Sequence, residues 1–270
     1  KSECELRIQP KGNLQSLSIT YAGPCFAVLG RNAFISTIHH VLVYCPRFES
    51  LILDVAVARG VGKAKEGIPL TMDEIIHSGT GRDHRPAPAR LRHLQLSHRS
   101  VALTSDCLKS PILTSLTSIA LRRSTGSRNP SFWEAMASSS IRLELVKVDG
   151  LVPETIECLK SCNSLRSFTV ETSFVNGAAE RQLDVTTAKA LFREALPRHR
   201  LSLEKVDIRV VEAGPWPDAL MEGLDKLQKC TELHVLRLPF SQDTSPRNQM
   251  YLVGCLPIRT RHSHSQLWPI

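Results

Sequence analysis

The sequence is poor in aromatic residues, which make up only 5% of its 270 residues, so any core must be aliphatic. It has no apolar run near the roughly 18 residues that a membrane-spanning helix needs. It also has no signal-peptide pattern at its start and no Asn-x-Ser/Thr glycosylation sequon. These absences predict an intracellular protein, cytoplasmic or nuclear, with no membrane partner. The chain opens at Lys1 rather than at methionine, which is typical of a fragment.

Cysteine is also too scarce for a disulfide-dense secreted scaffold, with eight residues that lie mostly inside apolar runs. Cys158 and Cys162 are one helical turn apart. A zinc site needs four ligands and usually shows a second close-spaced pair, which this sequence does not contain. We therefore interpret the cysteines as buried thiols in a reducing compartment, and we expect neither a metal nor another cofactor.

Motifs for nucleotide binding and for catalysis are missing as well. The segment Gly60-Val61-Gly62-Lys63-Ala64 fails as a phosphate-binding loop, because Val57 stands where the first glycine belongs and Ala64 where Ser or Thr belongs. No Gly-x-Ser-x-Gly elbow is present. We expect a non-catalytic protein. The alternative is an α/β enzyme with a site at strand ends, which predicts a deep pocket with convergent ionisable residues.

Positive charge is in excess, with 34 basic and 26 acidic side chains leaving +8. Basic residues are concentrated in three segments, 82–99, 121–128 and 258–265. No aromatic residues interleave with these segments as base-stacking platforms would require, so we interpret them as solvated faces and do not expect a nucleic-acid partner. A basic nucleic-acid- or phosphate-binding domain that uses Arg82 to Arg128 is kept as an alternative.

What the sequence does contain is a repeated apolar triplet. Eight segments place an apolar residue at a first position and again three and five residues later. Their starts are separated by 34, 43, 25, 27, 22, 38 and 30 residues. The triplets are Leu14/Leu17/Ile19, Phe48/Leu51/Leu53, Leu91/Leu94/Leu96, Leu116/Ile119/Leu121, Leu143/Val146/Val148, Leu165/Phe168/Val170, Leu203/Val206/Ile208 and Leu233/Leu236/Leu238.

Helix signals lie between the triplets. Proline at a first helical position, capping residues and apolar spacing predict six helices. They cover 32–44 and 71–78, or begin at Pro130, Pro153, Thr186 or Thr187, and Pro217; the helix that begins at Thr186 or Thr187 is stopped by Pro197. Short strands that alternate with helices imply parallel pairing through right-handed crossovers.

The residue between the second and third triplet positions shows which faces of the sheet are covered. In a doubly wound sheet both faces are covered, and strands are continuous apolar runs. Here six of the eight residues are polar or charged, which predicts that one face meets water. The residues are Ser18, Ile52, Gln95, Ala120, Lys147, Thr169, Asp207 and Arg237.

Units of the form C-x-x-L-x-x-L-x-L, beginning at Cys45 (with Phe48 as the first apolar residue), Cys162 and Cys230, resemble the irregular leucine-rich repeats of fungal F-box/leucine-rich-repeat proteins and ribonuclease-inhibitor-like folds. The resemblance implies an α/β solenoid of about eight repeats over residues 1–240, with a parallel sheet on the concave face and helices on the convex face. Residues 57–88 would be a long insertion and 241–270 an irregular or weakly packed tail. The Asn or Cys expected after each triplet is absent, which predicts irregular loops there.

The same resemblance implies a protein-interaction module that recognises substrates for a ubiquitin ligase. No F-box segment is present, so contact with a cullin-ligase adaptor would use a region missing here. Alternation along each strand predicts which side chains face a protein partner in the hollow. They are Gln95, Ser97, Arg122, Lys147, Asp149, Thr169, Glu171, Lys205, Asp207, Arg209 and Arg237.

Overall fold

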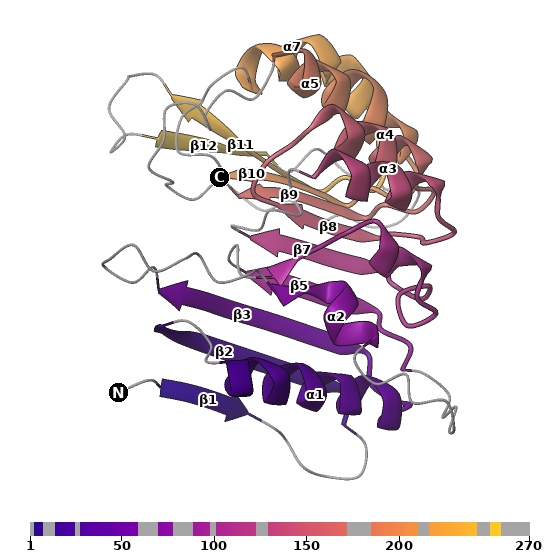
Figure 1. Ribbon diagram of the computed structural model, residues 1–270. Coiled ribbons are helices and arrows are strands. Elements are labelled where there is room, and N and C mark those ends of the chain that lie inside the picture. The colour runs from indigo at the N-terminus through magenta and orange to yellow at the C-terminus, as the bar shows by residue number, and fades with distance from the viewer. Residues whose placement is uncertain are drawn as a thin grey trace, which may run out of the picture.

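The computed structural model describes residues 3–7, 14–24, 28–58, 70–77, 89–97, 101–122, 129–171, 185–209, 216–241 and 249–254. Ten strands form one sheet in which they lie in chain order (Figure 1). They are β1 (Glu3–Arg7), β2 (Ser16–Pro24), β3 (Ser50–Ala58), β5 (His93–Ser97), β7 (Ser118–Arg122), β8 (Leu145–Val148), β9 (Ser167–Glu171), β10 (Lys205–Arg209), β11 (Val235–Ser241) and β12 (Gln249–Gly254).

The eight strands from β2 to β11 run parallel, which confirms an α/β fold with a mostly parallel sheet. Each of them carries one of the eight predicted apolar triplets. β1 and β12 close the two ends of the sheet by pairing antiparallel with β2 and β11. A second, two-stranded sheet joins β4 (Leu70–Thr71) to β6 (Val101–Ala102).

Residues 241–270 were expected to form an irregular or weakly packed tail. Within this segment, 249–254 form β12, a strand at the end of the main sheet. Most of the 57–88 insertion and residues 255–270 lie outside the described residues. Within the insertion, the structure places the end of β3, β4 and a short helix.

The register aligns the triplets across the sheet. Their middle residues pair in one row that begins with Leu17, Leu51 and Leu94 and ends with Val206 and Leu236. Every triplet residue is buried except Leu14, which is partly buried. Because successive side chains of a strand point to opposite faces, this row and the row of third triplet residues cover the same face of the sheet.

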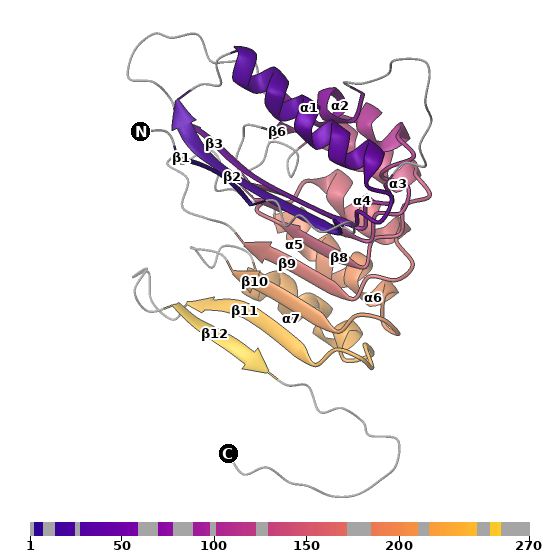
Figure 2. The same ribbon diagram turned by 90° about the horizontal axis from the view of Figure 1, so that it is seen from below.

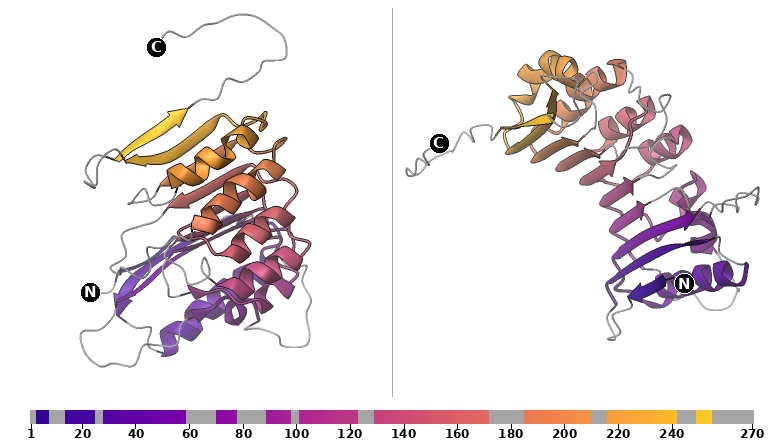
Figure 3. Two further views of the ribbon diagram at one scale, coloured as in Figure 1. Left: turned by 90° about the horizontal axis from the view of Figure 1, so that it is seen from above. Right: turned by 90° about the vertical axis from the view of Figure 1, so that its left-hand side faces the viewer.

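The helices of the described residues all lie on that apolar side. The sheet curves so that the helices are outside the curve and the helix-free face is inside it (Figures 2 and 3). The helices are α1 (Val28–Tyr44), α2 (Met72–His77), η1 (Asp106–Lys109), α3 (Pro130–Ser138), α4 (Pro153–Ser161), α5 (Val185–Ala190), the π-helical segment η4 (Leu191–Ala195), α6 (Leu196–Arg198) and α7 (Trp216–Leu227).

The predicted helix starts are confirmed at several points. Pro130 and Pro153 occupy the first helical positions of α3 and α4. The α2 capping box forms in both directions, because the Thr71 N–H donates to Glu74 Oε2 at 2.9 Å and the Glu74 N–H donates to Thr71 Oγ1 at 3.2 Å. The predicted stop at Pro197 is wrong by one residue. Proline is tolerated in the first turn of a new helical segment, and here it lies within α6.

A backbone ladder links each strand entry to the next. The carbonyl of the residue after each first triplet position accepts two N–H groups from the following unit, at 2.7 to 3.2 Å. The seven accepting residues are Gln15, Glu49, Arg92, Thr117, Glu144, Arg166 and Glu204. This arrangement holds successive units in one register on the side where the strands begin.

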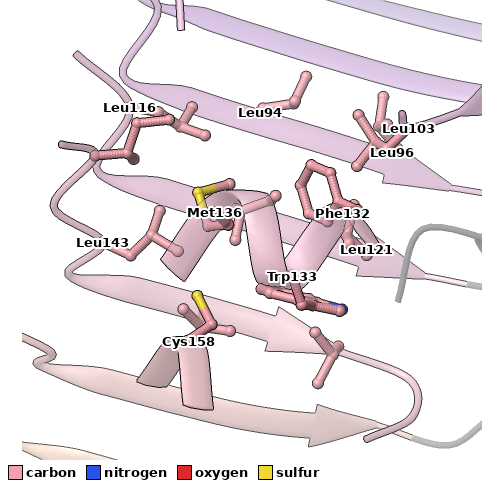
Figure 4. Packing of buried hydrophobic residues seen from close by; sticks show 14 of the residues in the cluster. Leu94, Leu96, Leu103, Leu116, Leu121, Phe132, Trp133, Met136, Leu143 and Cys158 are labelled. Carbon is pink, nitrogen blue, oxygen red and sulfur yellow. The ribbon is translucent and has the colours of Figure 1, made fainter. Parts of the chain in front are cut away.

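Two of the largest buried side chains of the core, Phe132 and Trp133, come from α3. Phe132, Trp133 and Met136 are buried among side chains of the sheet and of α4, which include Leu121, Leu143 and Cys158 (Figure 4). Phe132 and Trp133 stack edge to face with ring centroids 5.3 Å apart. Aromatic burial of this kind contributes more than any single aliphatic residue of the sheet.

Candidate functional site

The helix-free side of the sheet is called the open face, and it carries the alternate side chains of β2 to β11. On β2, β3 and β5 these side chains include a single charged residue, Asp54. On β7 to β10 and at Arg237 of β11 they are mostly charged. The charged residues that contact one another form the charge cluster, defined as Arg122, Lys147, Glu171, Lys205, Asp207, Arg209 and Arg237.

Asp207 is the centre of the larger part of the charge cluster. Arg209 donates to it twice, from Nε to Oδ1 at 3.0 Å and from Nη2 to Oδ2 at 2.8 Å. The Nζ of Lys205 lies 3.3 Å from Oδ2, and Nη1 of Arg237 lies 3.5 Å from the same atom. The Asp207 side chain is only 1% exposed because these three long side chains surround it.

Glu171 is the centre of the smaller part of the charge cluster, which also contains Arg122 and Lys147. Its Oε1 accepts a hydrogen bond from Arg122 Nη2 at 3.1 Å, and its Oε2 forms an ion pair with Lys147. Glu171 is paired in register with Arg209, so the two parts of the cluster adjoin on β9 and β10. The structure thus brings seven of the eleven predicted residues into one connected array.

Both carboxyl groups are held ionised. A hydrogen bond from Lys147, together with the charges of Lys147 and Arg122, lowers the pKa of Glu171. Burial opposes ionisation of Asp207, but hydrogen bonding from Arg209 and the charges of Arg209 and Arg237 outweigh it and lower its pKa. Since both acids stay negative near neutral pH, the five cations keep their partners there.

The cations, in contrast with the carboxylates, face solvent. Their side chains are between 33% and 45% exposed. An approaching molecule therefore meets the positive groups first, while Asp207 lies beneath them. Long charged side chains that are fixed by a buried counter-ion lose little further freedom on binding, which lowers the cost of complex formation.

The remaining predicted residues lie around the cluster. Gln95 is half-buried on β5, and Asp149, directly after β8, is also half-buried. Ser97 and Thr169 are buried, as Asp207 is, so these three do not offer the accessible surface that the sequence analysis assigned to them. Ser97 pairs in register with Asp54 and Arg122, and Thr169 pairs with Lys147 and Asp207, so larger side chains flank both of these short residues.

Two apolar side chains of the open face, Leu145 and Val235, were not predicted as part of the site. Leu145 on β8 is 40% exposed, and Val235 on β11 is half-buried. Each lies two residues after the first residue of its triplet and directly before the second. Their side chains therefore point to the same face as the charged residues. Alternation along the strand already assigns both residues to the open face. In a leucine-rich sequence, however, an apolar residue is typical of the core, so their exposure could not be predicted.

A hollow of about 680 Å³ lies where the strands begin. Its lining includes Arg47, Glu49, Arg90 and Arg92. In parallel α/β sheets ligands bind beyond the carboxyl ends of the strands, which is the opposite end. The lining also contains a single carboxylate. This hollow therefore gives no support to the enzyme alternative.

Of the five cysteines whose side chains the structure describes, Cys107, Cys158, Cys162 and Cys230 are buried as predicted, whereas Cys45 is only partly buried. Cys45, Cys162 and Cys230 each follow a helix and accept or donate turn hydrogen bonds at the corner before a strand. Burial raises the pKa of the Cys230 thiol to about 11. Among the residues that the structure describes, no group of three or more His, Cys, Asp or Glu side chains could hold a metal ion.

Within the described ranges, no helix combines the length and apolar character needed to cross a membrane. Comparison of the chain with family models, with curated proteins and with solved structures gave no match.

Proposed function

We propose that the chain is an irregular leucine-rich-repeat-like α/β solenoid of about eight units that binds another protein through its open face. Three features support this architecture: the chain order of the strands, the helices on one side, and the backbone ladder that repeats between neighbouring units. In a solenoid each unit contacts mainly its neighbours, and the inner surface of the curve serves as an extended binding surface.

The charge cluster is the observation that carries the binding proposal. A sheet face that serves only to meet water needs no buried carboxylate, since burying a charge is costly unless it is paired. Here two carboxylates hold five cations at fixed places on β7 to β11. Fixed charges on an open surface set the orientation and encounter rate of a partner.

We further propose, by resemblance to fungal F-box/leucine-rich-repeat proteins, that this binding recognises substrates of a ubiquitin ligase. Contact with the cullin-ligase adaptor would then belong to a region outside this chain, and the protein would act in the cytoplasm or nucleus. This step rests on the spacing of the apolar triplets and on the cysteines that precede three of them, because a fold by itself does not determine a function.

The test compares two variants with the same change in net charge. The open-face variant combines Arg122→Gln, Lys205→Gln and Arg237→Gln. It leaves Lys147 on Glu171 and Arg209 on Asp207, so each carboxylate keeps its nearest cation. We expect it to fold as the unaltered protein does, checked by thermal unfolding.

The loop variant combines Arg142→Gln, Arg200→Gln and Lys229→Gln. These exposed residues lie in the loops that lead into β8, β10 and β11. Proteins captured from a cell extract by the unaltered chain should be retained by the loop variant and lost by the open-face variant, as quantified by mass spectrometry. Retention of the same proteins by the open-face variant would refute binding through this face.

A further inference from the structure

We infer that the open face binds an acidic, extended segment of a partner protein, laid across β7 to β11. This inference rests on the proposed function and specifies its partner. The cluster together with Asp149 carries five positive and three negative charges, a net charge of +2. Since Asp207 is buried, the accessible balance is still more positive.

The spacing of the cations fits a peptide. Cations lie on β7, β8, β10 and β11, with Arg122 and Arg237 on the outer strands. Five neighbouring strands at about 4.8 Å span about 19 Å, which an extended chain at about 3.3 Å per residue crosses in about six residues. Glutamate or aspartate at alternate positions of a segment of seven or eight residues would place about four carboxylates along the span of the four strands that carry cations.

Two of the cations retain donors for such a ligand. The ammonium group of Lys205 has three N–H groups and makes one contact with Asp207 at 3.3 Å. The guanidinium of Arg237 has five N–H groups and contacts the same carboxylate at 3.5 Å. A carboxylate of the partner can therefore bind these groups without displacing Asp207, which remains paired with Arg209.

The exposed Leu145 adds an apolar contact to the positive surface. It lies two residues before Lys147 on β8 and is 40% exposed. An acidic segment with one apolar side chain would cover it, and this combination distinguishes a peptide from a simple polyanion. The described side chains of β7 to β11 on this face include no aromatic residue on which a nucleic-acid base could stack. We therefore favour a peptide over a single-stranded nucleic acid.

The experiment measures fluorescence anisotropy of a labelled peptide of about eight residues, in which glutamate alternates with serine and one central serine is replaced by leucine. The same peptide with glutamine in place of glutamate is the control ligand. We expect the acidic peptide to bind the unaltered protein and the loop variant equally. We expect about ten-fold weaker binding by the open-face variant, because each exposed ion pair contributes about a two- to three-fold factor.

Three outcomes overturn the inference. One is equal loss of binding in the loop variant and the open-face variant, which would show nonspecific attraction to net charge. Another is tighter binding of an oligothymidylate of the same charge, lost only in the open-face variant, which would make the ligand a nucleic acid.

The third is an acidic peptide that does not bind while the open-face variant still loses its captured proteins. In that case protein binding through the open face is supported, and the inference that the partner segment is acidic is refuted. Retained protein capture by the open-face variant would instead remove the proposed function itself. If the open-face variant fails to fold, the double variant Arg122→Gln with Arg237→Gln replaces it, with an expected loss of about five-fold.

Discussion

Replacing Asp207 with asparagine removes the charge around which three cations of the open face are arranged, while it keeps the shape of the side chain. The carboxylate accepts hydrogen bonds from Arg209 at 3.0 and 2.8 Å and lies near Lys205 and Arg237. Asparagine offers one acceptor oxygen and turns an N–H₂ group toward the guanidinium. At least one charge-assisted hydrogen bond is therefore lost.

The magnitude follows from burial. A hydrogen bond to a charged group contributes about 1.5–3 kcal/mol, and loss of one partner from a buried ion pair costs about 3–5 kcal/mol. The three cations are 33% to 42% exposed and can be hydrated in the variant, so the lower part of this range applies. We expect Asp207→Asn to lower the free energy of unfolding by about 2–3 kcal/mol near neutral pH.

The same variant has a characteristic pH dependence. The pKa of Asp207 in the folded protein lies below its ordinary value of 3.8, although burial opposes the shift, because Arg209 and Arg237 favour the charged form. Its contribution to stability is complete above the unfolded pKa and is lost as the pH falls through the folded pKa. Since the variant lacks this group, the two proteins should approach equal stability in acid.

Urea unfolding followed by circular dichroism, from about pH 7 to about pH 3, measures this difference. The control is Glu204→Gln, which removes the carboxylate of the exposed ion pair with Arg166 and should change stability much less. Equal stability of Asp207→Asn and the unaltered protein near pH 7 would refute the account of the cluster. A difference that stays constant down to about pH 3 would do the same.

Three other changes test the packing. A Cβ added at Gly223 would lie 2.6 Å from the Cβ of Phe192, so Gly223→Ala should lower stability in urea by about 1–2 kcal/mol, after about 1 kcal/mol gained from helix propensity; Met221→Ala, exposed in the same helix, is the control and should have little effect. Phe168→Ala, at a fully buried site of β9, should cost about 3–5 kcal/mol in guanidinium unfolding, and a loss under about 1 kcal/mol would contradict its place in the core. Burial lowers the pKa of His199 below 6.5, so thermal stability should fall as the pH drops from about 7 to about 5, whereas His199→Gln should lack this loss; an identical pH dependence in both proteins would be inconsistent with the buried imidazole.

The parallel part of the fold was predictable because its strands share one local pattern. A strand with one covered face needs apolar residues at alternate positions, and the entry corner needs one more. Leu165, Phe168 and Val170 show this pattern, and the register pairs equivalent residues of all eight strands. Helix starts were equally local, since proline and capping residues act within a single turn.

The strands at the ends of the sheet were not predictable in this way. β1 and β12 pair antiparallel with their neighbours and carry no triplet. Their positions depend on the free backbone edges of β2 and β11, which exist only once the parallel strands have assembled. The continuation past Pro197 has a similar origin, because a π-helical turn precedes that residue and changes which backbone groups are paired.

The candidate site was predictable in membership more than in geometry. Alternation along the strands places Glu171, Asp207 and Arg237 on one face. The burial of Asp207 depends instead on the long side chains that contact it. These belong to Lys205 and Arg209 of its own strand and to Arg237 of β11. Spacing along one strand contains no information about such lateral contacts. The exposure of Leu145 was missed for the same reason.

The most direct test of binding through the open face is site-specific photo-crosslinking in a cell extract. A photoreactive amino acid replaces Leu145, which is exposed on the open face, or Met221, which is more exposed on α7 on the opposite side of the sheet. The account predicts covalent capture of partner proteins from position 145 and little from position 221. Capture from position 221 alone would contradict it.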